Sequence, residues 1–324
     1  MLTDSTIKNP KWITAEINGG LGNQLYQIFH AIAFSLKMNR PFYFKYMDRI
    51  LGHASVRGTY WAIDSLLCAL APNVLYDPVE NARRDQSRLV IHESGHHYTP
   101  IGIPDPADDF PEVICLAGYF QSYKYFEKEF DQICEITGIS ACREKFRAEC
   151  TKRGFPIANI SMHFRLGDYQ QLQDIHPIMP MIYYRNALRF LVDHIKTKEP
   201  TSKKITVLYF CEAADNNYVL ENYMKQLIEL FPECDFTLAD QRLSDWKQML
   251  YMSLCDHHII GNSTFSLWGA QLNPSPTKQV CYPWKWFTEA FVRRDRRFVH
   301  DMFPPTWKKI AWLYYSPQFR NYSY

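Results

Sequence analysis

Three short segments of the sequence place glycines or polar side chains where a predicted strand passes into a turn. The first, Asn18 to Gln24 (NGGLGNQ), separates a predicted strand at 12–17 from a predicted helix at 23–38. Glycines let the backbone approach a ligand closely, and the start of a helix offers free N–H groups to an anion. The segment lacks the Gly-Lys-Ser/Thr of a P-loop and the third glycine of a dinucleotide site. It therefore fits a tight structural turn equally well.

The second segment contains the arginine best placed to bind an anion. A predicted strand at 157–164 runs into Arg165, with Gly167 and Asp168 close behind. A guanidinium at the carboxyl end of a strand can make charge-assisted, bidentate contacts with a diphosphate leaving group. The alternative is an ion pair between Arg165 and Asp168 that only holds the loop.

The third segment joins a short predicted strand at 258–261 to a predicted helix at 265–272. Between them lie Asn262, Ser263 and Thr264, followed by Phe265. Serine or threonine in this position is typical of a helix N-cap. The same hydroxyl and amide groups can also bind a phosphate, so the segment alone leaves both functions open.

Composition and charge exclude several classes of partner. The 324 residues include 36 basic and 34 acidic side chains, a net charge of +2 that favours neither nucleic acid nor an acidic partner. Nine cysteines show no C-x-x-C pair or zinc-like spacing, which indicates reduced thiols. Asp108 and Asp109 lie in a proline-rich loop, and the histidine-rich cluster at 92–97 is interpreted as exposed polar residues. We therefore expect no metal site.

The N-terminus lacks the basic start and apolar run of a signal peptide. No stretch approaches the roughly 18 apolar residues that a membrane-spanning helix needs. We expect a cytoplasmic protein without a transmembrane segment, and the oligomeric state is left open.

Strands and helices alternate in each half of the chain. In the second half, predicted strands at 157–164, 205–211 and 258–261 alternate with helices at 183–196, 218–231, 246–255 and 265–272. Repeated βα units predict a parallel sheet with helices on both faces. We expect an α/β protein with two Rossmann-like domains, residues 1–152 and 153–324, and a ligand at the carboxyl ends of strands in the crevice between them.

Together and in this order, the three segments resemble glycosyltransferase family 11, the α-1,2-fucosyltransferases. The family's G-G-L-G-N-Q-[LM]-[FY]-Q motif matches residues 19–27, and its H-x-R-R-G-D-Y motif is approached at 163–169. Its N-S-T-F-S-x-W-G-A-x-L motif matches 262–272, and weaker similarities include Gly118–Ser122. The resemblance covers roughly residues 13 to 287.

The resemblance implies a GT-B architecture and an inverting, metal-independent transfer of L-fucose from GDP-fucose to a hydroxyl of a glycan acceptor. The donor is held mainly by the second domain, with no further cofactor and no nucleic-acid partner. Two residues are implied in catalysis: Arg165, which contacts the β-phosphate and stabilises the leaving nucleotide, and Asn23, which faces the sugar and acceptor hydroxyl. The identity of a general base is left open. The residues implied in donor binding are Gly20, Gly22, His163, Asp168, Asp245, Gln248, Asn262, Ser263, Thr264 and Phe265.

Three positions depart from the family pattern. Leu166 stands in place of the second arginine, and F-C-E-A at 210–213 replaces the usual F-S-D-D. Gln248 stands where the family has an aspartate that reads the guanine edge, and an amide has only one acceptor oxygen. Asp245, one helical turn earlier, can substitute for it because i and i+3 share a face. The alternatives are a transferase of the same fold with another donor, such as a UDP-sugar, or a non-catalytic glycan- or nucleotide-binding relative.

Overall fold

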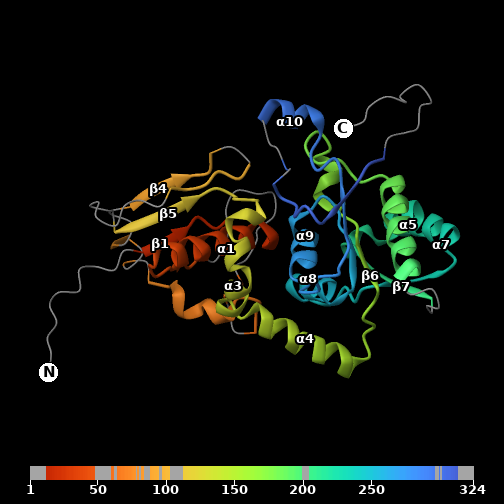
Figure 1. The fold of residues 1–324 in the computed structure, drawn as a ribbon, viewed down its shortest axis with the longest axis horizontal. Coiled ribbons are helices and arrows are strands. Elements are labelled where there is room, and N and C mark those ends of the chain that lie inside the picture. The colour runs from red at the N-terminus through yellow and green to blue at the C-terminus, as the bar shows by residue number, and fades with distance from the viewer. Residues whose placement is uncertain are drawn as a thin grey trace. The chain divides into compact units, whose positions relative to one another are not determined.

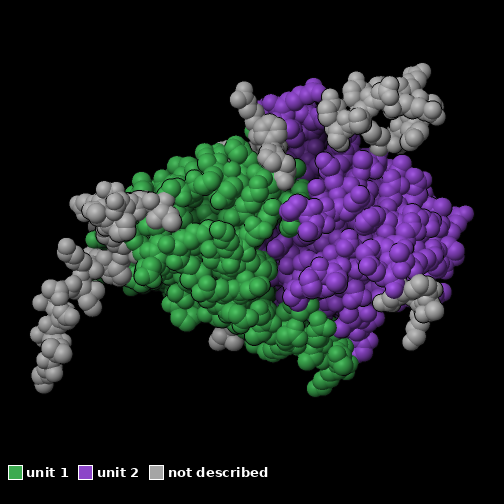
Figure 2. Space-filling model, viewed as in Figure 1, with its two compact units in different colours: residues 1–153, 295–304 green, residues 154–294, 305–324 purple. Residues whose placement is uncertain are grey.

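The computed structural model describes residues 12–47, 60–61, 64–77, 79, 82–83, 88–94, 97–102, 112–198, 204–295, 299 and 301–312. The chain divides into two compact units (Figure 2): unit 1 comprises residues 1–153 and 295–304, and unit 2 comprises residues 154–294 and 305–324. The roles of the two units in holding acceptor and donor remain predictions.

Unit 1 is built on a three-stranded parallel sheet in the order β1-β5-β4 (Figure 1). Its central strand β5 is buried along its whole length, which explains the uninterrupted apolar sequence VICLA. The strands are β1 (Trp12–Ala15), β4 (Arg88–His92) and β5 (Val113–Ala117), with a second small parallel pair of β2 (Phe44–Lys45) and β3 (Val74–Leu75). The helices are α1 (Leu21–Met38), α3 (Phe130–Ile136) and α4 (Ile139–Arg153).

Unit 2 is built on a six-stranded parallel sheet in the order β11-β10-β9-β6-β7-β8. The strands are β6 (Ile160–His163), β7 (Ile205–Phe210), β8 (Cys234–Leu238), β9 (His257–Ile259), β10 (Val280–Pro283) and β11 (Lys308–Ile310). The helices are α5 (Met181–Lys198), α6 (Asn216–Val219), α7 (Lys225–Leu230), α8 (Asp245–Leu254), α9 (Thr264–Gln271) and α10 (Glu289–Asp295). A π-helical turn, Leu220–Met224, joins α6 to α7.

Helices cover both faces of this sheet. Helices α5 and α7 lie on one side of it and α8 and α9 on the other (Figure 1). Strand β7 is accordingly buried on both faces, with residues such as Val207 and Leu208 pointing in opposite directions. The predicted α/β class, with a parallel sheet in each unit, is confirmed. The GT-B architecture stays an implication of the family resemblance. In the described part of the chain, no helix has the length and apolar character needed to cross a membrane.

Helices α8 and α9 pack together at Gly269. A Cβ added to this glycine would lie 2.8 Å from the Cβ of Met252, closer than real side chains approach. The absence of a side chain therefore sets how closely α9, and the loop before it, can lie against α8.

We expect Gly269→Ala to destabilise the protein by about 1–2 kcal/mol, because overpacking costs about 1–3 kcal/mol and the gain in helix propensity is about 1 kcal/mol. Urea unfolding measures the difference. Gly102→Ala is the control, since nothing lies within 4 Å of the added Cβ there. Equal stability of the two variants would contradict the packing argument.

Candidate functional site

In unit 2 the neighbouring strands β6 and β9 end side by side, and the segments that follow them contain most of the predicted site residues. Gly261, directly after β9, makes this close approach possible. A Cβ at that position would lie 3.2 Å from the carbonyl oxygen of His163 and 3.4 Å from the Cβ of Arg165. The glycine therefore lets the two strand-end loops meet at one edge of the sheet.

Arg165 lies between two carboxylates at this edge. Its Nη1 donates to Glu212 Oε1 at 2.5 Å, and its Nη2 donates to Asp168 Oδ1. The guanidinium also lies over the ring of Tyr169, 4.9 Å from the ring centroid. The Arg165 side chain is only 17% exposed, whereas those of Asp168 and Glu212 are 47% and 54% exposed. The guanidinium group of Arg165 is thus held in place by three side chains, whereas the two exposed carboxylates can turn toward solvent.

These surroundings keep Arg165 charged. Burial by itself lowers the pKa of the guanidinium, but Tyr169, Asp168 and Glu212 outweigh it, and the net effect is a raised pKa. The ion pair between Arg165 and Asp168 that the sequence suggested as a structural alternative is present. It coexists with an orientation of the fork that could serve an anion.

Tyr169 joins the loop after β6 to the loop after β9. Its hydroxyl donates to the backbone oxygen of Asn262 at 3.0 Å, and its ring stacks on His176 with centroids 4.3 Å apart. Burial raises the pKa of Tyr169 to about 12, although the charge of Arg165 acts in the opposite direction. Tyr169 therefore stays a hydrogen-bond donor.

The start of α9 shows the N-cap that the sequence suggested. Ser263 is the N-cap, and its Oγ accepts from Phe265 N at 3.3 Å. Asn262 is fully buried, and its Nδ2 donates to the backbone oxygens of Pro177 and Trp286 at 2.9 and 3.1 Å. Thr264 and Phe265 are half-buried at the first turn of the helix. The predicted N-cap is therefore present, and phosphate binding by the same segment stays a prediction.

Two buried polar atoms of this edge have no hydrogen-bond partner among the residues that the structure describes. They are Nδ1 of His163 and Oδ1 of Asn262, which come from the ends of β6 and β9. Buried polar atoms are almost always paired, so these two are exceptions at the edge where Arg165 lies, although Asn262 is 0% exposed and His163 is 8% exposed. The His163 ring also packs on Phe265, with centroids 5.7 Å apart.

Two predicted donor-binding residues lie at the start of α8. Gln248 Nε2 donates to the backbone oxygen of Leu243 at 3.1 Å. Asp245 is exposed, and its Oδ1 accepts from Trp246 N at 2.7 Å. The side-chain amide of Gln248 is thus oriented by the loop before α8, because its Nε2 donates to the backbone oxygen of Leu243.

The three remaining predicted residues form a separate group in unit 1. Gly20 is the N-cap of α1, and Gly22 is buried in its first turn. Asn23 Oδ1 accepts from Gln121 Nε2 at 2.9 Å. The structure thus gathers the other predicted residues in unit 2 and these three at the end of β1.

Glu212 and Tyr169 were not among the predicted site residues. Glu212 follows β7, the strand beside β6 in the sheet, so adjacency of the strand ends is the signal that could have identified it. Sequence comparison had marked the position only as a departure from the family pattern. Asp215 is similarly placed and accepts from Gly167 N at 2.9 Å, which holds the turn after Arg165.

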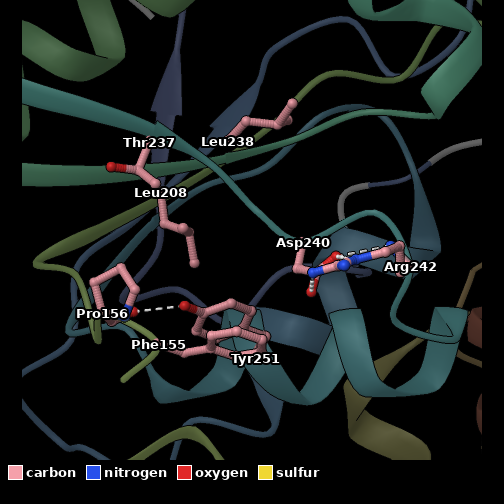
Figure 3. Close-up of a pocket in the computed structure, with 8 residues that line it drawn as sticks. All are labelled: Phe155, Pro156, Leu208, Thr237, Leu238, Asp240, Arg242 and Tyr251. Atoms are coloured by element: carbon pink, nitrogen blue, oxygen red, sulfur yellow. Dashed lines mark hydrogen bonds and ion pairs between the residues drawn. The ribbon is translucent and has the colours of Figure 1, made fainter. Parts of the chain in front are cut away.

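A groove of about 340 Å³ also lies on unit 2 (Figure 3). The rings of Phe155 and Tyr251 stack along it, 5.9 Å apart, and the ion pair of Asp240 and Arg242 lies at its rim. Leu208, from the middle of β7, also lines it. None of the predicted site residues lines this groove, so it is separate from the edge described above.

Among the residues that the structure describes, no group of three or more histidines, cysteines, aspartates or glutamates is gathered so that it could hold a metal ion. Of the histidine-rich cluster, His96 lies outside the described residues, as do Asp108 and Asp109.

Comparison with known proteins gives a family and several relatives. The model of the family described as Glycosyl transferase family 11 matches residues 102–311. The O-antigen biosynthesis glycosyltransferase WbnK of Escherichia coli is 23% identical over 305 residues, covering 84% of this chain and 93% of the relative. An alpha-1,2-colitosyltransferase of Escherichia coli is 22% identical, covering 92% of this chain and 98% of the relative. A galactoside 2-alpha-L-fucosyltransferase of Caenorhabditis elegans is 24% identical, covering 92% of this chain and 79% of the relative.

The burial of His163 predicts a pH-dependent stability. Burial, together with the charge of Arg165, lowers the pKa of His163 from 6.5 to about 3. The unfolded chain therefore binds this proton first as the pH falls, and the stability present above pH 6.5 is lost between pH 6.5 and 3. In His163→Gln the slope of unfolding free energy against pH in this window should fall by up to about 1.4 kcal/mol per pH unit.

Urea unfolding of both proteins at several pH values measures these slopes. Identical slopes would mean that His163 binds its proton equally well in the folded and unfolded chains, contrary to its buried position.

Proposed function

The chain belongs to glycosyl transferase family 11 and is a glycosyltransferase, and we propose that it transfers L-fucose from GDP-fucose to a hydroxyl of a glycan acceptor. In this proposal the anomeric configuration is inverted and no metal ion takes part. The observation that carries it is the fixed guanidinium of Arg165 beside the start of α9.

The proposed reaction breaks the bond between the sugar's anomeric carbon and the diphosphate oxygen and forms a bond from that carbon to the acceptor oxygen. The acceptor hydroxyl releases its proton to solvent. Negative charge develops on the leaving nucleotide, where Arg165 and the amides at the start of α9 would stabilise it. Binding in this way requires the guanidinium to exchange Asp168 or Glu212 for a phosphate oxygen. Their exposed side chains make that exchange possible.

His163 lies beside Phe265 at the same edge, with ring centroids 5.7 Å apart. Because His163 is neutral at physiological pH, it would act by hydrogen bonding and packing beside the nucleoside rather than by charge. Asn23 would face the sugar and the acceptor hydroxyl. We assign no general base.

The names of the relatives support a deoxysugar-type donor, since one is named for fucose and another for colitose. Gln248 is the observation that favours a second candidate, a transferase of the same fold with another nucleotide. Its side chain offers one acceptor oxygen and its Nε2 already donates to Leu243 O. If the donor is GDP-fucose, the carboxylate that accepts from the guanine N–H groups would be Asp245.

We expect GDP, without added metal and in the presence of a chelator, to stabilise the protein. At a free concentration of 100 Kd the unfolding free energy should rise by about 2.7 kcal/mol, because the ligand binds only the folded state. UDP at the same concentration should leave it unchanged. Thermal unfolding followed by calorimetric titration makes the comparison. Stabilisation by UDP alone would mean that the donor is a UDP-sugar and not GDP-fucose. Asp245→Asn should weaken GDP binding if the Asp245 carboxylate accepts from guanine.

We expect Arg165→Lys to lower kcat by about 10²–10³, since lysine keeps the charge but loses the bidentate fork that the leaving group needs. The assay follows fucose transfer from GDP-fucose to methyl β-D-galactoside, a probe suggested by the name of the nematode relative.

Arg242→Lys is the matched control. Arg242 is also paired with a carboxylate through two nitrogens, but it is 87% exposed at the rim of the separate groove. Equal turnover of the two variants would remove Arg165 from the reaction. Glycan binding without turnover in the unaltered protein would favour the non-catalytic alternative.

A further inference from the structure

One peptide at the carboxyl end of the sheet in unit 1 is held from both sides. The carbonyl of Gly118 accepts from Gln27 Nε2 at 3.2 Å, and the N–H of Tyr119 donates to Glu93 Oε2 at 2.9 Å. These two groups belong to the same peptide plane, directly after the central strand β5. Its orientation is therefore fixed by side chains and not by the sheet ladder.

The two clamping side chains also join the three strand ends. Gln27 Oε1 accepts from Asn18 N at 2.9 Å, so this side chain connects the end of β1 to the end of β5. Glu93 directly follows β4 and connects that strand to β5. A chain of hydrogen bonds thus crosses the edge of the sheet at which ligands of α/β proteins bind.

One face of helix α1 packs against the segment that follows β5. Asn23, Gln27 and His30 are spaced i, i+4 and i+7, so they share a side of the helix. Asn23 Oδ1 accepts from Gln121 Nε2 at 2.9 Å. The ring of His30 packs on both Phe120 and Tyr125, with centroids 4.3 Å apart in each case. Burial lowers the pKa of His30 to about 3, with the charge of Lys37 acting in the same direction, so it is a neutral packing group.

The backbone of the loop Gly118–Ser122 includes an unusual conformation, which the hydrogen bonds and ring contacts just described hold in place. Phe120 has φ of 50°, a left-handed conformation that an aromatic residue rarely adopts, and it is 1% exposed. A Cβ on Gly118 would lie 2.4 Å from the Cβ of Glu93. Strained conformations persist where the surroundings over-determine them, and they cluster at functional sites.

The side chains that this loop leaves half-buried are Tyr119 and Gln121. A tyrosine ring offers an apolar face with a polar hydroxyl, and an amide offers both donors and an acceptor. This combination suits the apolar C–H face and the hydroxyls of a sugar ring.

We propose that Tyr119 and Gln121 bind the acceptor sugar, beside Asn23, and that Gln27 and His30 are positioning residues that hold their loop. The inference rests on the proposed function, because it assumes a glycan acceptor. It assigns the residues of the first motif a task that differs from phosphate binding: the helix orients a sugar-binding loop.

The test compares Gln27→Leu and Tyr119→Leu in the full chain. Leucine is similar in size to the buried Gln27 but removes both of its hydrogen bonds, so the loop loses its clamp while Tyr119 and Gln121 remain. We expect each variant to raise the KM for methyl β-D-galactoside by about tenfold or more, the effect of losing roughly one good contact. The Kd for GDP and the slow hydrolysis of GDP-fucose by water should stay within about twofold of the unaltered protein.

Thr137→Val is the matched control. Thr137 is fully buried in unit 1, and its Oγ1 donates to Ile133 O at 2.7 Å at the end of α3. This variant loses a buried hydrogen bond away from the loop, so its melting temperature should fall while the acceptor KM stays unchanged.

Two results would overturn the inference. One is a fall in melting temperature for Gln27→Leu and Tyr119→Leu like that of the control, with an unchanged acceptor KM. The other is weaker GDP-fucose binding or slower hydrolysis at an unchanged acceptor KM, which would assign the loop to the donor. If the unaltered protein neither binds GDP nor transfers fucose, the proposed function fails first and this inference falls with it.

Discussion

The guanidinium of Arg165, held between Asp168 and Glu212, is the interaction on which the candidate site depends. Its two carboxylates come from the turn after β6 and from the end of β7, so the ion pairs fix two neighbouring strand ends relative to one another. Gly261 then brings the end of β9 against the same arginine, and Tyr169 ties that loop by a hydrogen bond to Asn262. A single charged side chain thereby sets the geometry of three loops.

In unit 1, hydrogen bonds to one peptide join the strand ends. There, neutral and charged hydrogen-bonding groups of Gln27 and Glu93 close the edge of the sheet around one peptide. In both units the element that follows a buried strand is held by side chains from a neighbouring element. Such cross-links keep strand-end loops rigid enough to position functional groups.

The sequence predicted the regular core well and the contacts between motifs poorly. Helices such as α1 and α5 show a clear apolar period, and buried strands such as β5 and β7 show apolar runs. The prediction missed β8, a sheet edge with alternate exposed residues, β11, a second edge with two exposed residues, and β10, which lies between β9 and β11. Arg165 and the segment at 262–265 were identifiable from motifs. The link from Gln27 to Gly118 spans 91 residues, and only the fold reveals it.

The arrangement around Arg165 has a consequence for how a nucleotide arrives. One positive and two negative side chains leave the immediate surroundings with a net negative charge, and the whole chain carries only +2. No strong positive field would therefore guide an anionic donor from a distance. Capture would depend on short-range hydrogen bonds formed as the carboxylates turn away. Dissolved salt weakens the ion pairs that break as well as the contacts that form, so the association rate should vary little with ionic strength.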